Sequence, residues 1–169
     1  SLTGPTGHVY AFEPSNINFA ILRQACADLS NTHLMNFGLG STSQELTFIQ
    51  GEDELGANSR VAPTDGKQSD LTMSTISIRS SDEIINTREA LPPNGIKIDT
   101  EGFELEVLNG LRSQLKDASL RFIGIEVHFK LLKERGTPNA PQDIENLLKN
   151  NGFQVAWIDS SHILATRNS

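Results

Sequence analysis

Four apolar, strand-like segments of this chain end at a residue type that suits ligand binding. These positions are Glu13, Gly38, Asp99 and Glu126. In an open α/β sheet, ligands bind in the crevice beyond the carboxyl ends of the strands. An unpaired buried charge at such a position would be costly, whereas a carboxylate there can accept hydrogen bonds from ligand hydroxyl groups. We therefore expect these strand ends to form a ligand-binding edge.

Glu13 ends the first apolar segment and is followed directly by Pro14. At the end of a strand in a nucleotide-binding sheet, a carboxylate can accept hydrogen bonds from both hydroxyls of a ribose. The alternative is a solvated carboxylate in the turn before Pro14. Position alone does not separate these two interpretations.

Asp99, Glu101 and Glu104 form the densest acidic group in the sequence. Lys97, Asp99 and Glu101 share strand parity, so their side chains would face the same way if the strand continued. For Glu104 we favour a structural role, because the first turn of a helix favours an anion. Carboxylates also suit magnesium or calcium, but the spacing matches no established ligand pattern, and we predict no metal site.

Histidine is the residue type best suited to proton transfer near neutral pH. His128 shares strand parity with Glu126 at a strand end, where it could act as a general base. A structural histidine with satisfied hydrogen bonds is the alternative. Structural roles without an acidic partner are expected for the other three histidines, His8, His33 and His162.

Alternating strands and helices must position these residues. Strands are expected over 9–12, 32–37, 45–49, 72–79, 95–99, 120–127, 153–158 and 162–166. Helices are expected over 16–30, 82–90, 104–116, 129–134 and 141–150. The polar stretch 51–70 lacks apolar periodicity and predicts a functional or mobile loop. This order predicts one α/β domain, a mostly parallel sheet covered on both faces and closed by an antiparallel hairpin.

Composition limits the possible partners. The chain has 169 residues, 37% of them hydrophobic and 21% charged, which indicates a globular domain. Its net charge of −7 argues against a nucleic-acid partner.

No apolar run approaches the roughly 20 residues of a membrane span, and no secretory leader is evident. The single Cys26, expected as a buried helical thiol, fits a reducing, cytoplasmic location, and a homo-oligomer is compatible with these features.

The common phosphate-binding motifs are missing from the sequence. It contains neither G-x-G-x-x-G nor a P-loop. The glycines of Gly4-Pro-Thr-Gly7 precede a strand, whereas a phosphate-binding loop must follow one.

Longer stretches connect these positions into a recognisable pattern. They are Gly4-Pro-Thr-Gly-His-Val-Tyr-Ala-Phe-Glu-Pro14, Asn36-Phe-Gly-Leu-Gly40, Ile96-Lys-Ile-Asp-Thr-Glu-Gly-Phe-Glu104, Val107-Leu-Asn-Gly110, Ile125-Glu126 and Gly152-Phe153. Together they resemble the FkbM family of S-adenosylmethionine-dependent methyltransferases over nearly the whole chain. The I-K-I-D-x-E-G-x-E stretch is specific, whereas A-F-E-P is shared more widely among methyltransferases.

The resemblance implies a Rossmann-like class I methyltransferase sheet with S-adenosylmethionine across its carboxyl edge. It places Glu13 and Pro14 at the cofactor ribose, and Gly38 and Leu39 beside the adenine. Asp99 would contact the cofactor near its sulfonium. Asp99 and Glu101 would lie beside the acceptor, where either carboxylate or His128 could take its proton. The implied reaction is O-methylation of a hydroxyl on a sugar or secondary metabolite, which makes the acceptor a small molecule or glycan.

One part of the family pattern is missing. Family members carry a first strand and an aspartate-containing, glycine-rich loop ahead of the segment where this chain opens. That strand lies mid-sheet, between those that end in Glu13 and Asp99. We expect an N-terminally truncated domain over 1–169. The two alternatives are that the sheet closes directly, without this strand, or that another chain supplies it. These residues alone should bind the cofactor weakly or not at all.

Two other functions are compatible with the sequence. A catalytically silent methyltransferase-like fragment, used for interaction, would also explain the missing loop. A different nucleotide-cofactor enzyme, such as a dehydrogenase, fits less well because the Asp99-Thr-Glu101 turn does not belong to that pattern.

Overall fold

The computed structural model describes residues 3–4, 6–49, 60–61 and 73–167. The helices are α1 (Asn16–Ala25), α2 (Ser81–Asn86), α3 (Glu104–Asn109), the 3-10 helix η1 (Gln114–Lys116), α4 (Phe129–Glu134) and α5 (Ala140–Asn150). The strands are β1 (Val9–Phe12), β2 (Thr32–Met35), β3 (Gly38–Gly40), β4 (Gln44–Ile49), β5 (Arg60–Val61), β6 (Met73–Ser80), β7 (Gly95–Ile98), β8 (Phe122–Glu126), β9 (Gln154–Trp157) and β10 (His162–Thr166).

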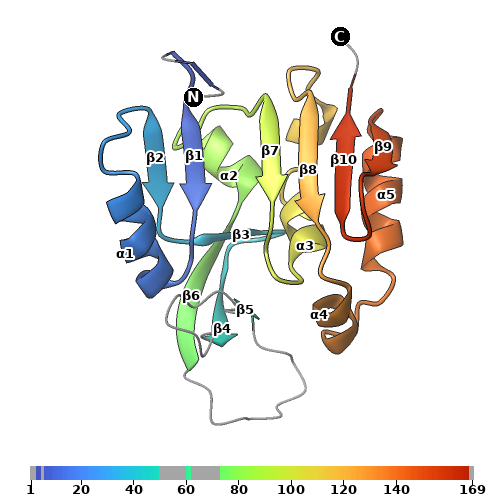
Figure 1. Ribbon diagram of the computed structural model, residues 1–169, viewed down its shortest axis with the longest axis horizontal. Helices are drawn as coiled ribbons and strands as arrows, with labels where there is room; N and C mark the ends of the chain where they lie inside the picture. Colours follow the sequence, from blue (N-terminus) through green and yellow to red (C-terminus); the bar gives the residue numbers. More distant parts are fainter. Residues whose placement is uncertain (1–2, 5, 50–59, 62–72, 168–169) are drawn as a thin grey trace.

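The described strands form three sheets. β1 and β2 make a parallel pair, and the other sheets have the orders β7-β8-β10-β9 and β3-β6-β4-β5. β7 runs parallel to β8, whereas β10 is antiparallel to both β8 and β9. The predicted Rossmann-like α/β class with a closing antiparallel hairpin is therefore confirmed (Figure 1). The pairing is mixed rather than mostly parallel: among the described strands, three neighbouring pairs run parallel and four run antiparallel.

β1 and β7 belong to different sheets. In the part of the chain that the structure describes, no hydrogen-bonded strand pair joins them. Figure 1 shows β1, β2, β7 and β8 pointing the same way, so their carboxyl ends share one side of the molecule. Direct closure of the sheet, one of the three arrangements considered above, is therefore not seen among the described strands.

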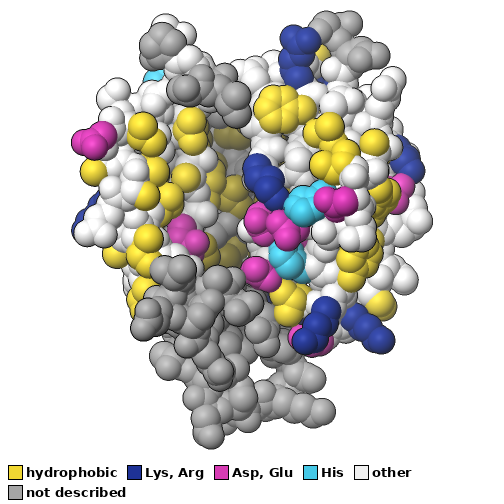
Figure 2. All heavy atoms as spheres, viewed as in Figure 1, with side chains coloured by type: hydrophobic (Ala, Val, Ile, Leu, Met, Phe, Trp, Pro, Cys, Tyr) yellow, Lys and Arg dark blue, Asp and Glu magenta, His cyan; other side chains and the backbone are white. Residues whose placement is uncertain are grey.

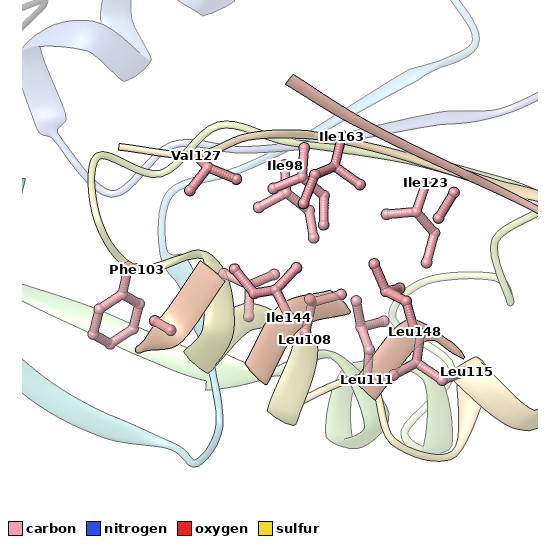
Figure 3. Close-up of a cluster of buried hydrophobic side chains, with 14 of the residues drawn as sticks. Ile98, Phe103, Leu108, Leu111, Leu115, Ile123, Val127, Ile144, Leu148 and Ile163 are labelled. Carbon is pink, nitrogen blue, oxygen red and sulfur yellow. The ribbon is translucent and has the colours of Figure 1, made fainter. Parts of the chain in front are cut away.

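The main core lies between the β7-β8-β10-β9 sheet and helices α3 and α5. Figure 3 shows Ile98, Ile123 and Ile163 of the sheet facing helix residues that include Leu108 and Ile144. These five side chains are at most 2% exposed. Burying an aliphatic side chain of this size contributes about 1.5–3 kcal/mol, so this layer anchors the strand ends of β7 and β8.

The predicted helix 104–116 divides into α3 and η1 at Gly110. A Cβ atom at Gly110 would lie 2.0 Å from the carbonyl oxygen of Gly40, so the two backbones are in close contact. The carbonyl oxygen of Gly110 accepts hydrogen bonds from the Asp82 amide at 2.8 Å and the Ser80 hydroxyl at 3.2 Å. Tertiary hydrogen bonds have therefore replaced the helical continuation that the apolar spacing predicted.

Other element boundaries also differ from the prediction. α1 ends at Ala25 instead of extending to Ser30, and Cys26 is its partly buried C-cap rather than a buried helical residue. α2 ends at Asn86, where Thr87 turns its hydroxyl back to the carbonyl oxygen of Glu83. Helix ends depend on such local capping, which apolar periodicity does not encode.

Gly38–Gly40 forms strand β3 rather than the end of the preceding strand, and it runs parallel to β6. Most of the polar stretch 51–70 lies outside the described residues, apart from the short strand β5. Among the described helices, none is long and apolar enough to cross a membrane.

Candidate active site

The turn after β7 has an unusual backbone. Glu101 has φ +51° and Gly102 has φ +88°. Glycine adopts such angles readily, whereas a non-glycine residue does so rarely and at a conformational cost. A Cβ atom at Gly102 would lie 2.9 Å from Cβ of Leu131, so the turn also packs closely on α4. The turn thereby carries the Glu101 side chain toward the start of α4.

Three carboxylates surround one nitrogen of His128, which directly precedes α4. Nε2 lies 3.4 Å from Glu101 Oε2, 3.7 Å from Asp99 Oδ1 and 3.9 Å from Glu126 Oε1. The three predicted catalytic residues, Asp99, Glu101 and His128, are therefore neighbours. Their proximity follows from the parallel pairing of β7 and β8, which aligns the two carboxyl ends.

Glu104 contacts the opposite side of the same ring. It is the first residue of α3 and is fully buried. Its Oε1 accepts a hydrogen bond from the Gly102 amide at 2.9 Å and lies 2.8 Å from Nδ1 of His128. The expected role in the first helical turn is thus accompanied by a contact that sequence reasoning missed. We call Asp99, Glu101, Glu104, Glu126 and His128 the His128 cluster.

The surroundings favour protonation of two members of this cluster. The hydrogen bond with Glu104 raises the pKa of His128, and the nearby Glu101 carboxylate adds to this, while burial opposes it. Burial raises the pKa of Glu101, although the His128 charge opposes the shift. Perturbed pKa values in one cluster at a strand-end edge are typical of catalytic sites.

The His128 cluster also has the spacing of a cation site. One ligand atom each from Asp99, Glu101 and His128 lies within 4.8 Å of the others. When His128 is protonated, the ring itself supplies a positive charge beside these carboxylates. The same groups can therefore hold a cation or, with His128 protonated, retain a proton.

Two basic residues border the cluster. Nζ of Lys97 lies 3.8 Å from Asp99 and 3.7 Å from Glu126, which agrees with the strand parity expected of Lys97 and Asp99. Nε2 of His162 lies 3.3 Å from Glu126 Oε2, and its Nδ1 lies 2.9 Å from Asp159. Figure 2 shows acidic and histidine side chains gathered at the centre of this face, beside a hollow.

The expectation that His162 has no acidic partner is wrong. Asp159 caps the turn before β10 by accepting from the amides of Ser161 and His162. The β8–β10 register then places His162 opposite Glu126. The spacing of Asp159 and His162, three residues apart around a tight turn, was the available signal.

The predicted cofactor residues at the β1 end form a second group. Oε1 of Glu13 accepts a hydrogen bond from the Ser15 amide at 2.7 Å, and burial raises the pKa of Glu13. A Cβ atom on Gly38 would lie 3.4 Å from Cγ of Pro14 and 2.7 Å from Cδ1 of Ile78. Pro14 and Gly38 are therefore adjacent, and packing explains the glycine. Leu39 is partly buried against the core.

The fold and the strand-end carboxylates define the class: an α/β domain of the methyltransferase type, with its candidate site at the carboxyl edge. The sequence pattern of the Methyltransferase FkbM domain matches residues 1–155. The chain belongs to the FkbM methyltransferase family.

Two known proteins illustrate the relationship. The hexuronic acid methyltransferase AglP of Haloferax volcanii is 33% identical over 122 residues, covering 72% of this chain and 47% of the relative. The FkbM methyltransferase of Methylobacillus flagellatus KT superimposes with a TM-score of 0.60 at 19% identity, covering 94% of this chain and 36% of that structure. The chain thus spans about half the length of the curated relative.

Proposed function

We propose that the protein containing this chain is an S-adenosylmethionine-dependent methyltransferase that methylates a hydroxyl group of a sugar. The single observation that carries this proposal is the His128 cluster at the carboxyl ends of β7 and β8, in a chain of the FkbM family. The name of the Haloferax relative, a hexuronic acid methyltransferase, supports a sugar as the acceptor. A secondary metabolite with a free hydroxyl is the alternative acceptor.

The residues at the β1 end suit the cofactor. An ionised Glu13 carboxylate has about four lone-pair sites, of which the Ser15 amide and the Asn18 side chain use two. Its carboxylate thus retains acceptor capacity for ribose hydroxyls, in a partly buried setting that strengthens such bonds. Pro14, Gly38 and Leu39 would border the same ligand, and Asp99 would contact it from β7.

The His128 cluster suits the acceptor. When bound, S-adenosylmethionine supplies an electrophilic methyl group. His128 in its neutral form would take the proton of the acceptor hydroxyl at Nε2, which makes the acceptor oxygen a better nucleophile. Asp99 and Glu101 then stabilise the imidazolium and orient the hydroxyl. Most of the acceleration comes from holding oxygen and methyl carbon in line.

Calorimetry and product formation test this proposal with the full-length protein. We expect S-adenosylmethionine to bind and S-adenosylhomocysteine to form when a hexuronic acid glycoside or a neutral hexoside is added. His128→Asn should lower kcat about 10²–10⁴-fold, the usual contribution of a general base. Absence of cofactor binding would refute the enzyme and favour an interaction domain. Turnover of non-sugar alcohols alone would refute the sugar.

A further inference from the structure

We propose that Glu104 is a positioning residue, which holds the His128 ring through Nδ1 and leaves Nε2 free to accept the acceptor's proton. This inference rests on the proposed function and assigns a role to a residue that the sequence indicated only as part of a helix end. Its basis is the geometry of Oε1, which serves two hydrogen bonds at once.

The hydrogen bonds of Glu104 favour one tautomer of His128. The backbone amide of Gly102 can only donate, so Oε1 acts as an acceptor toward it. For an ionised Glu104, which has no proton to give, the 2.8 Å contact with His128 requires a proton on Nδ1. In a neutral ring with Nδ1 protonated, Nε2 carries the lone pair. Nε2 is the nitrogen that faces Asp99 and Glu101.

The burial of Glu104 argues against a purely structural role. Its side chain is 0% exposed, and Oε2 has no hydrogen-bond partner among the described residues. A buried, incompletely paired carboxylate destabilises a fold compared with an apolar residue of similar size. Its Oε1 has hydrogen bonds with the Gly102 amide and the His128 ring. A hydrogen-bonded carboxylate behind a histidine fixes the ring orientation and stabilises its protonated form.

Charged groups lie on both sides of the His128 ring. Asp99, Glu101 and Glu126 lie within 4 Å of Nε2, from β7, the following turn and β8. Lys97 pairs with Asp99 and Glu126, and His162 pairs with Glu126. Glu104 from α3 is the described carboxylate that bonds Nδ1. Its effect on ring orientation is therefore separable from that of the other acids.

The kinetic test uses Glu104→Gln in the full-length protein, with Glu106→Gln as the matched control. Glu106 is a second carboxylate of α3, and its partner is Arg135, at 3.5 Å. The glutamine oxygen can still accept from Gly102, so folding should be preserved. Because the neutral amide no longer stabilises the protonated ring, we expect kcat to fall about 10²-fold, with KM changed less than about 3-fold. The control should stay within about 2-fold, and in a His128→Asn background Glu104→Gln should cause no further loss.

Nitrogen NMR of His128 gives a readout that needs no turnover. In the wild-type protein, Nδ1 should carry the proton of the neutral ring, and in Glu104→Leu the two tautomers should mix. A wild-type ring protonated at Nε2, or a Glu104→Leu ring that keeps the wild-type tautomer, would overturn the inference. Equal kcat losses in the two glutamine variants would overturn it as well. If the wild-type protein transferred no methyl group, the proposed function would fail, and the NMR result would still decide the role of Glu104.

Discussion

Replacing Gly110 with alanine should disrupt the contact that positions α3 on β3. The added Cβ would lie 2.0 Å from the carbonyl oxygen of Gly40 and 2.9 Å from its carbonyl carbon. Both atoms are backbone, so no side-chain rotation relieves the clash. The carbonyl oxygen of Gly110 is also held by the Asp82 amide, which limits how far Gly110 can retreat.

The expected loss of stability is at the upper end of the range for overpacking. Inserting a methyl group into a well-packed region usually costs about 1–3 kcal/mol, and backbone partners relax least. We therefore expect Gly110→Ala to lower the free energy of unfolding by about 3 kcal/mol. For a domain of this size, that corresponds to a decrease in Tm of about 6–12 °C.

Gly124→Ala provides the matched control for thermal denaturation followed by circular dichroism. A Cβ atom at Gly124 would meet only Cδ of Lys97, at 3.8 Å, which is an ordinary contact. Gly124 lies within β8, so alanine there should be neutral or stabilise by about 0.4–1 kcal/mol through the unfolded state. If the two variants melted within about 2 °C of each other, the close packing of α3 on β3 would be refuted.

Three further outcomes are expected. In the full-length protein, Glu13→Gln should weaken S-adenosylmethionine binding about 10-fold in calorimetry, because a hydrogen bond to a charged group contributes about 1.5–3 kcal/mol. Unchanged affinity would remove Glu13 from the cofactor site. In urea denaturation, Gly102→Ala should lower the free energy of unfolding more than Gly136→Ala does. Both glycines have positive φ, but only a Cβ atom at Gly102 would lie 2.9 Å from Leu131. Equal losses of stability would contradict the close packing of the turn. The raised pKa of His128 means that the folded state holds its proton more tightly. The resulting stabilisation is complete below the ordinary histidine pKa of 6.5 and is lost as the pH rises through the raised value. His128→Asn should flatten that part of the urea-midpoint profile, and an unchanged profile would count against the assignment.

Much of the element order could be predicted, because it depends on local patterns. Apolar runs of strand length and helical spacing located β1, every strand from β6 onward and all five α-helices. The predicted bounds of β1, α4 and β10 are exact, whereas those of α1, α2 and α3 extended too far. Strand parity correctly grouped Lys97 with Asp99 and Glu126 with His128, since alternation along a strand is a property of the backbone. The acidic residues at the strand ends, Glu13, Asp99 and Glu126, could likewise be identified directly from the sequence.

The remaining features of the fold depend on contacts between elements that are far apart in the sequence. Apolar periodicity carries no information about these contacts. Gly38–Gly40 became a strand because its glycines allow close packing on Ile78 and Phe103. The end of α3 at Gly110 was decided by the backbone of Gly40, 70 positions earlier in the chain. Neither partner carries a side-chain signal that indicates the other.

The site shows the same division. The sequence by itself determined which residues could carry charge or a proton at the carboxyl ends of β7 and β8. Only the tertiary structure brought Glu104 against Nδ1 of His128, 24 positions apart, while Glu101 approached Nε2. The reason is physical: the pairing of β7 with β8 and the packing of α3 fix the distances between these groups, and residue spacing along one chain does not.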